Sequence, residues 1–231
     1  MNRVWLAAGA LALTGCTHER DFASLYRDLH PSVVYITMRA PSSDPHLHGK
    51  LDDAYGTALV IESGPWGTRI LTAKHVIDDA RDLRARVADA TVSQKVRIVA
   101  LDRRDDLALL EVEGVTNASP VAIGDSDSLV PGQSIGLIGY PIPDAFQDEG
   151  LGTTASIYTG HVASIRAKGT ADEAIELDLP IIPGESGAPV FTTDGKVVGI
   201  AESRFEEEHA IGFATPMRLI DPFLKAHRHR P

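Results

Sequence analysis

Short runs of hydrophobic residues, several of them alternating with polar residues, follow one another along most of this chain. Alternation with a period of two residues is typical of half-buried β-strands, and the Gly, Pro, Asp and Ser clusters between the runs are typical of turns. The pattern predicts strands at Val33–Met38, Tyr55–Ile61, Thr68–Ala73, Lys95–Leu101, Leu107–Val112, Ser134–Tyr140, Ser156–Ile165, Ala174–Leu177, Ala188–Phe191, Lys196–Ala201 and Ile211–Ala214. Many short strands with few helices between them indicate an all-β sandwich or barrel.

Apolar residues recur at helical spacing in two stretches, one toward each end of the chain. In residues 19–29 they are Phe22, Leu25, Tyr26 and Leu29, and Pro31 follows them. A repeat of three to four residues marks one face of a helix, so we expect a short helix there and a closing helix at Pro216–His227. Between the strands, Gly114–Pro120 is rich in turn residues and is predicted to connect two halves of similar length.

The composition is that of an ordinary globular protein, with 43% hydrophobic and 23% charged residues over 231 positions. This length is sufficient for one large all-β domain or two small ones. Lys and Arg number 22 against 32 Asp and Glu, which gives a net charge of -10. The balance disfavours a nucleic-acid partner, because phosphate binding requires clustered cations. The single cysteine excludes a disulfide within the chain.

Residues 1–16 read as an export signal, because Arg3 precedes an uncharged stretch that is too short to span a bilayer. The ending Leu13-Thr-Gly-Cys16 resembles the lipobox of bacterial lipoproteins, whose cysteine is acylated and becomes the first residue of the mature chain. The resemblance implies a signal peptide over residues 1–15 and a lipid anchor at Cys16 that holds the protein to a membrane of the cell envelope. Thr17 after the cysteine favours the periplasmic side of the outer membrane. The alternative is an ordinary signal peptide with an accidental cysteine.

A candidate nucleophile lies in Gly184-Glu185-Ser186-Gly187, immediately before a predicted strand. A serine hydroxyl needs a base to remove its proton and backbone N–H donors to stabilise the oxyanion that forms on attack. Gly184 allows the bend that would let its own N–H and that of Ser186 converge, and Gly187 removes a side chain beside the reacting centre. The alternative for such a short motif is a surface turn with an exposed serine.

The candidate base is His75, which an apolar strand delivers at its end, on the first turn of a predicted short helix. The carboxylate that would orient the imidazole is Asp106, because it directly abuts the next strand, whereas Asp102 and Asp105 read as solvated turn residues. Five of the other histidines are expected to have no catalytic role. They lie in a loop where a solvated pair is favoured over a metal site (His46 and His48), in mid-strand (His161) and in a basic tail (His227 and His229).

Short sequence motifs along nearly the whole chain resemble those of the bacterial HtrA/Deg branch of the trypsin-like peptidases. They include Gly56-Thr-Ala-Leu-Val-Ile, Ile70-Leu-Thr-Ala-Lys-His-Val, Asp105-Asp-Leu-Ala-Leu-Leu-Glu-Val, Ile138-Gly-Tyr-Pro, Gly160-His-Val-Ala-Ser-Ile, Gly184-Glu-Ser-Gly and Ile211-Gly-Phe-Ala-Thr-Pro. The resemblance implies two antiparallel six-stranded β-barrels of the chymotrypsin type, with the active site in the cleft between them. The first barrel supplies His75 and Asp106 and the second supplies Ser186, with Gly184 and Ser186 as oxyanion donors.

The implied organisation is a tether and helix over residues 16–30, a first barrel over 31–117, and a second barrel with the closing helix over 118–231. The family usually continues into PDZ domains, and this chain ends soon after Pro216, so we expect none. Glu185 departs from the Asn that usually precedes the nucleophile in this branch. We expect the Glu185 carboxylate to pair with a cation, the candidates being Lys168, Arg166 and Arg204, or to remain solvated.

In the two-barrel fold, three segments form the pocket for the side chain before the scissile bond. Carried over to this chain, they supply Leu179, Pro180, Ala201, Glu202, Ser203, Gly212, Phe213 and Ala214. Pro180 stands where trypsins place a carboxylate, so the pocket is expected to accept small or medium aliphatic side chains rather than Arg or Lys. Glu202 is the one acidic residue in this set, and if its side chain pointed into the pocket, the pocket would accept a basic residue.

The sequence therefore predicts a serine endopeptidase that cleaves exported or misfolded proteins through an acyl-enzyme, with polypeptides as its substrates. This chemistry requires neither a cofactor nor a metal ion. The alternative is a non-catalytic binding or chaperone-like protein on the same fold, because a fold does not establish a function.

Overall fold

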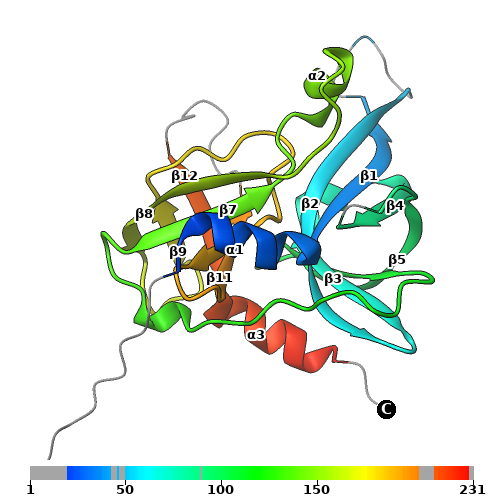
Figure 1. The fold of residues 1–231 in the computed structure, drawn as a ribbon. Coiled ribbons are helices and arrows are strands. Elements are labelled where there is room, and N and C mark those ends of the chain that lie inside the picture. Colours follow the sequence, from blue (N-terminus) through cyan, green and yellow to red (C-terminus); the bar gives the residue numbers. More distant parts are fainter. Residues whose placement is uncertain (1–19, 43–45, 47–49, 89, 203–210, 229–231) are drawn as a thin grey trace, which may run out of the picture.

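The computed structural model describes residues 20–42, 46, 50–88, 90–202 and 211–228. It consists of two closed, antiparallel, six-stranded barrels that lie side by side, which confirms the predicted fold class (Figure 1). The first barrel contains β1 (Val33–Pro41), β2 (Leu51–Gly64), β3 (Gly67–Ala73), β4 (Arg81–Val87), β5 (Gln94–Asp102) and β6 (Leu107–Val112) in the order β1-β2-β3-β6-β5-β4. The second contains β7 (Ser134–Gly139), β8 (Ser156–Arg166), β9 (Ala174–Leu177), β10 (Pro189–Thr192), β11 (Val197–Glu202) and β12 (Gly212–Pro216) in the order β10-β11-β12-β9-β8-β7.

Short helices lie outside the barrels. They are α1 (Phe22–Leu29), α2 (Pro143–Asp148) and α3 (Met217–Ala226), with the 3-10 turns η1 (His30–Ser32), η3 (Lys74–Ile77) and η4 (Ser126–Ser128). The Asp21 carboxylate caps α1 by accepting from the Ser24 amide at 2.8 Å, which satisfies one of the unpaired N–H groups of the first turn. None of the helices in the described part of the chain has the length and apolar character needed to cross a bilayer.

Three groups of buried apolar side chains form the core. One fills the first barrel and another fills the second. The third group lies between the barrels, and α1 and α3 cover it; among its members are Leu25, Leu29, Leu59, Leu71, Leu107, Phe191, Ile200, Ile220 and Phe223. Both barrels and the helices α1 and α3 therefore contribute to this third group, and the shared packing fixes the barrels relative to each other.

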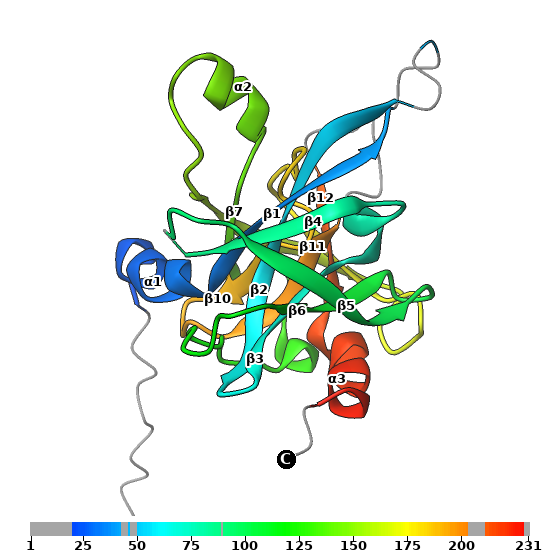
Figure 2. The same cartoon turned by 90° about the vertical axis from the view of Figure 1, so that its right-hand side faces the viewer.

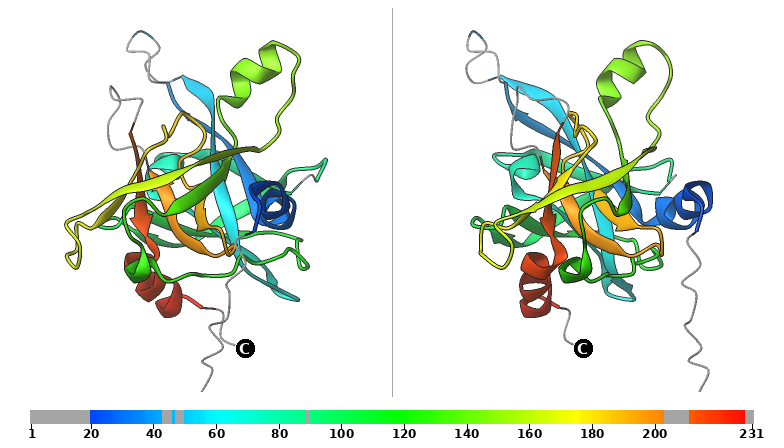
Figure 3. Two further views of the ribbon diagram at one scale, coloured as in Figure 1. Left: turned by 60° about the vertical axis from the view of Figure 1, so that its left-hand side comes forward. Right: turned by 90° about the vertical axis from the view of Figure 1, so that its left-hand side faces the viewer.

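The sequence pattern missed β4 and α2. In β4 only Ala85 is buried, and charged residues occupy most other positions, so no alternation of apolar residues is visible. The strand exists because it pairs with β1 and with β5, and these pairings close the first barrel. Helix α2 follows Ile142, whose φ of 31° is left-handed. It projects from the same end of the molecule as the β1–β2 hairpin and is separated from the outer end of that hairpin (Figures 2 and 3).

Candidate active site

The β3–β6 pairing brings His75 and Asp106 together. Ala73 at the end of β3 is opposite Leu107 at the start of β6, so the residues that follow one strand lie beside the residue that precedes the other. The Asp106 carboxylate accepts from the His75 amide at 2.9 Å, and its second oxygen is 2.5 Å from His75 Nδ1. Both oxygens of one carboxylate thus hold one histidine, through its backbone and its ring.

The backbone of Asp106 is itself held in an uncommon conformation. Its φ of 52° is left-handed, a region that aspartate tolerates better than most residues. The Asp106 carbonyl accepts from the Lys74 amide at 2.8 Å, so three hydrogen bonds connect this one residue to the start of η3. A strained residue persists only where its surroundings determine it strongly, and such residues are common at functional sites.

The carboxylate of Asp106 is the main influence on the charge of the imidazole. Its hydrogen bond raises the pKa of His75, burial opposes this rise, and the negative charges of Asp106, Glu202 and Asp78 add to it. The His75 side chain is 41% exposed, so solvent or a second molecule can reach the ring. Because Nδ1 faces Asp106, Nε2 is the nitrogen that can exchange a proton elsewhere.

The turn before β10 holds Ser186 half-buried against the first barrel. The Ser186 carbonyl accepts from the Thr57 amide of β2 at 3.1 Å, and the Gly184 carbonyl accepts from the Thr57 hydroxyl at 2.7 Å. Thr57 is fully buried, and its hydroxyl also accepts from the Tyr140 amide at 3.0 Å. The sequence indicated the turn but gave no role to Thr57, whose only signal is a polar residue inside an apolar strand.

Two positions in the turn require glycine, because the backbone of other segments lies too close to leave room for a side chain. A Cβ at Gly184, whose φ is 97°, would lie 2.1 Å from the Tyr140 carbonyl oxygen. A Cβ at Gly187, whose φ is 85°, would lie 2.2 Å from the Thr57 carbonyl oxygen. Any other residue at either position would combine a disfavoured backbone conformation with a steric clash, so the turn depends on glycine for its shape.

Hydrogen bonds within the turn set the direction of the two amides expected to bind an oxyanion. The Pro183 carbonyl accepts from the Ile142 amide at 2.8 Å, and the Glu185 carbonyl accepts from the Ala188 amide at 2.9 Å. In a trans peptide the N–H points opposite to the carbonyl. The amides of Gly184 and Ser186 therefore point away from Ile142 and from Ala188, respectively.

The expectation that Glu185 pairs with a cation or remains solvated is wrong for the described residues. Glu185 is 1% exposed; one carboxyl oxygen accepts from the Ile182 amide at 3.0 Å, and the other is buried without a hydrogen bond. Arg166 binds Glu176 and Lys168 binds the Asp127 carbonyl instead, while Arg204 lies outside the described residues. Burial raises the pKa of Glu185 to about 7.

The residues expected to form a substrate pocket are only partly brought together. Leu179, Ala201 and Ala214 are buried in the core of the second barrel. Gly212 lies against Leu179, because a Cβ there would lie 2.5 Å from the Leu179 carbonyl oxygen. Pro180 is exposed and Phe213 is half-buried. Ser203 and the proposed lipidation site Cys16 both lie outside the described residues.

Glu202 is set apart from those apolar residues. It is 7% exposed, accepts from the Thr215 hydroxyl at 3.1 Å, and lines a small cavity together with Asp105 and Asp106. The same cavity corrects the interpretation of Asp105 as solvated, because the Asp105 side chain is only 17% exposed and burial raises its pKa. The sequence pattern placed several carboxylates near the candidate dyad, but which of them lie inside depends on the packing of both barrels.

Comparison with known proteins gives consistent matches. The family model of the trypsin-like peptidase domain matches residues 56–200. The chain is 28% identical to the serine protease Do-like HtrA of Bacillus subtilis over 211 residues, which are 87% of this chain and 47% of that protein. It is 32% identical over 202 residues to a probable periplasmic serine endoprotease DegP-like of Pseudomonas putida, covering 84% of this chain and 38% of the relative.

A solved structure supports the same fold. The HtrA-type protease AlgW with tripeptide superposes with a TM-score of 0.71 and 22% sequence identity, over 89% of this chain and 63% of that one. The chain thus spans about half the length, or less, of the curated relatives it matches. Because the family model covers more than half of the chain, the protein belongs to the trypsin-like peptidases.

Proposed function

We propose that the protein is a serine endopeptidase in which Ser186 is the nucleophile, His75 the general base and Asp106 the residue that orients the base. The bidentate contact of Asp106 with the His75 amide and ring is the observation that supports this most strongly. It directs Nε2 away from Asp106. The half-buried Ser186 belongs to a turn of the second barrel that is held by Thr57 of the first barrel, the barrel that also carries His75 and Asp106.

The reaction follows from these roles. The Ser186 oxygen bonds to the carbonyl carbon of the scissile peptide while His75 Nε2 takes the hydroxyl proton. The amides of Gly184 and Ser186 stabilise the oxyanion. The carbon–nitrogen bond then breaks, the imidazolium returns the proton to the leaving amine, and an acyl-enzyme remains. Water activated by His75 hydrolyses this ester and regenerates the serine.

The apolar character of the second barrel near the serine bears on specificity. Leu179 and Ala214 are buried together there, and Glu202 is hydrogen-bonded to Thr215 on the other face of the sheet. A basic side chain would enter this region without a partner, at a cost that exceeds the gain from contact with an aliphatic one. Small or medium aliphatic residues such as Ala, Val or Leu are therefore the proposed residues before the scissile bond.

The proposed location is the cell envelope, where the substrates would be exported or misfolded proteins. The lipobox-like ending at Cys16 and the periplasmic description of the Pseudomonas relative support export. Retention by a lipid at Cys16, with the outer membrane favoured over the inner one, is the finer part of the proposal.

A digest of a mixed peptide library by the purified protein tests both the triad and the specificity. Ser186→Ala should abolish cleavage, with turnover reduced on the order of a millionfold if the three residues act as one unit. It should also abolish labelling by a fluorophosphonate probe. Ser128→Ala, which changes an exposed serine, is the matched control and should leave both signals unchanged.

Two results would contradict the proposal. Retention of more than a few per cent of activity in Ser186→Ala would remove the serine from its role. Dominant cleavage after Arg or Lys would overturn the pocket assignment and leave the triad untouched. A folded wild-type protein that neither cleaves the library nor reacts with the probe would instead indicate a non-catalytic role for this fold.

A further inference from the structure

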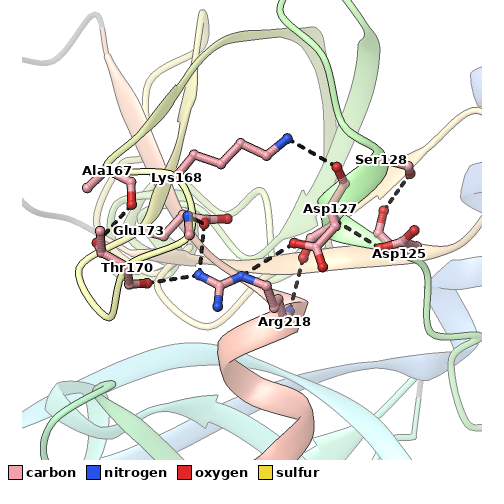
Figure 4. Close-up of polar contacts among 10 residues, drawn as sticks. Asp125, Asp127, Ser128, Ala167, Lys168, Thr170, Glu173 and Arg218 are labelled. Carbon is pink, nitrogen blue, oxygen red and sulfur yellow. Dashed lines mark hydrogen bonds and ion pairs between the residues drawn. The ribbon is translucent and has the colours of Figure 1, made fainter.

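A small cavity of about 90 Å³ adjoins Asp106 on the side where the two barrels meet. Carboxylates from three segments line it: Asp105 and Asp106 before β6, Asp172 and Glu173 before β9, and Glu202 at the end of β11. Within the described ranges, ion pairs with arginines are seen at Glu173 and Asp105. The Glu173 carboxylate pairs with the Arg218 guanidinium (Figure 4), with 2.8 Å between Oε2 and Nη2, and the Asp105 carboxylate lies 3.9 Å from Arg104 Nε. The Glu202 carboxylate accepts a hydrogen bond from the Thr215 hydroxyl.

The strand pairing fixes the side to which Glu202 points. Successive side chains of a strand face opposite sides of the sheet. Ala201 and Ala214 point into the second barrel, where they pack with Leu179. Glu202 is opposite Phe213 in the β11–β12 register, so its side chain lies on the other side, toward the first barrel. Ile200, two residues earlier in β11, lies on the same side and packs in the apolar group between the barrels.

We propose that Glu202 is a positioning residue of the candidate triad, a second buried carboxylate that acts with Asp106 to stabilise the protonated form of His75. This inference rests on the proposed function and deepens it, since it gives the base two anions in place of one. Glu202 acts through His75 and makes no contact with the substrate. It is correspondingly not a determinant of the residue before the scissile bond.

The charged groups around His75 come from three segments. Asp106 precedes β6, Asp78 follows η3 and pairs with Lys74, and Glu202 ends β11; all three carboxylates raise the pKa of His75, the hydrogen bond from Asp106 most of all. The Asp78 side chain is 52% exposed, so water and salt screen its charge. Glu202 is 7% exposed, so its charge is screened much less.

Two opposite effects on the reaction follow. The imidazole becomes positive as it takes the Ser186 proton, and a second buried anion lowers the energy of that state. The same anion keeps the resting base protonated at higher pH, where it cannot accept a proton. Glu202 would thus make His75 a stronger base. It would also raise the pH below which His75 is protonated and activity is lost.

Glu202→Gln tests this, because glutamine retains the size of the side chain and an acceptor for Thr215 while removing the charge. The pKa of His75, followed by NMR of the ring nitrogens, should fall relative to the wild type. The acid limb of kcat/KM against pH should move to lower pH, and kcat on the plateau should fall severalfold with KM unchanged. Asp78→Asn is the matched control and should produce a smaller shift in the same direction.

Further variants separate charge from packing. Glu202→Asp retains the charge and should keep the His75 titration close to that of the wild type. Glu202→Ala is a second neutral variant for the case that the glutamine variant does not fold, and it should lower the pKa of His75 as well.

An unchanged His75 titration in a folded neutral variant would overturn the proposal, and so would a raised KM with an unchanged pH profile, which would place Glu202 in the substrate pocket. The NMR titration needs no activity. A fall in the pKa of His75 in a protein without peptidase activity would therefore reject the proposed function and retain the electrostatic role of Glu202.

Discussion

At the scale of single residues, Glu185 is the least usual group near the candidate nucleophile. It carries a carboxyl group into the interior immediately before Ser186, and among the described residues the only hydrogen bond to that carboxyl group comes from the Ile182 amide. Loss of water around the charged form raises the pKa of Glu185 from 4.5 to about 7. The group is consequently neutral in mildly acidic solution and becomes a buried charge as the pH rises through neutrality.

This raised pKa predicts a pH-dependent stability. Between about pH 4.5 and 7 the unfolded chain loses the Glu185 proton more readily than the folded one, so the free energy of unfolding falls as the pH rises and levels off above about 7. Glu185→Gln removes this penalty. Its stability relative to the wild type should therefore increase from pH 4.5 to pH 8, by up to roughly 3 kcal/mol at 1.36 kcal/mol per pKa unit.

Urea denaturation at several pH values measures the effect. Glu149→Gln, which changes an exposed glutamate at the end of α2, is the matched control and should differ from the wild type by the same small amount at every pH. A Glu185→Gln variant with a constant stability difference across this range would show that the carboxyl group titrates at its ordinary value in the folded protein.

At the scale of elements, Arg218 at the start of α3 connects three separate parts of the second barrel. Its guanidinium contacts the Glu173 carboxylate and the Thr170 carbonyl, each at 2.8 Å, in the loop between β8 and β9. It also lies 3.4 Å from the Asp127 carboxylate, and its backbone amide donates to the Ser126 hydroxyl in η4 at 3.0 Å. Figure 4 shows the guanidinium between these groups. The contacts hold α3, η4 and the loop before β9 in one arrangement.

Loss of this arginine should be costly, because the Glu173 side chain is only 1% exposed. Arg218→Met leaves that carboxylate buried without its cation, and we expect a loss of about 3–5 kcal/mol in the free energy of unfolding. The double variant Arg218→Met with Glu173→Met removes both charges and should recover most of the loss.

Chemical denaturation of the single and double variants completes a mutant cycle. Lys225→Met breaks the more exposed Lys225–Asp221 pair of the same helix and should cost less than about 1 kcal/mol. If Arg218→Met costs no more than this control, the contacts of Arg218 do not contribute to stability in the way described.

At the scale of the whole molecule, the two barrels meet through contacts that also shape the candidate site. Thr57 of the first barrel bonds to both Gly184 and Ser186 of the second, and its carbonyl accepts from the Thr72 hydroxyl at 2.7 Å. The apolar group between the barrels includes Leu25 and Leu29 of α1. The N-terminal helix is therefore part of the folded body, and the proposed anchor at Cys16 lies six residues before it begins.

The anchor predicts how the whole protein behaves toward detergent. After expression with its own N-terminus in a bacterium that processes lipoproteins, the protein should enter the detergent phase of a Triton X-114 partition. Cys16→Ser should leave the chain uncleaved or move it to the aqueous phase, while peptidase activity should be unchanged. A mature N-terminus at another residue, with no mass added to Cys16, would show that the N-terminal segment is not a lipoprotein signal.

Much of this architecture can be predicted from the sequence, because strands, helices and turns depend on residues that are close together in the chain. The apolar run Leu107–Val112 predicts β6 with its observed bounds, and the helical spacing in residues 19–29 predicts α1. The glycines on both sides of Ser186 signal a turn that needs unusual backbone conformations. Strand alternation, helix spacing and turn chemistry are local, so a single chain displays them without knowledge of its partners.

The tertiary structure decided the remaining features, because each depends on residues far apart in the chain. Strand β4 is mostly charged and exists through pairing with β1 and β5. Burial raises the pKa of Glu185 to about 7, and Glu202 lines one cavity with Asp106 because the packing of the two barrels brings the end of β11 close to the segment before β6. Burial and electrostatic coupling act through space. The sequence therefore determined which residues are candidates for the chemistry, and the packing of the two barrels determined their environment.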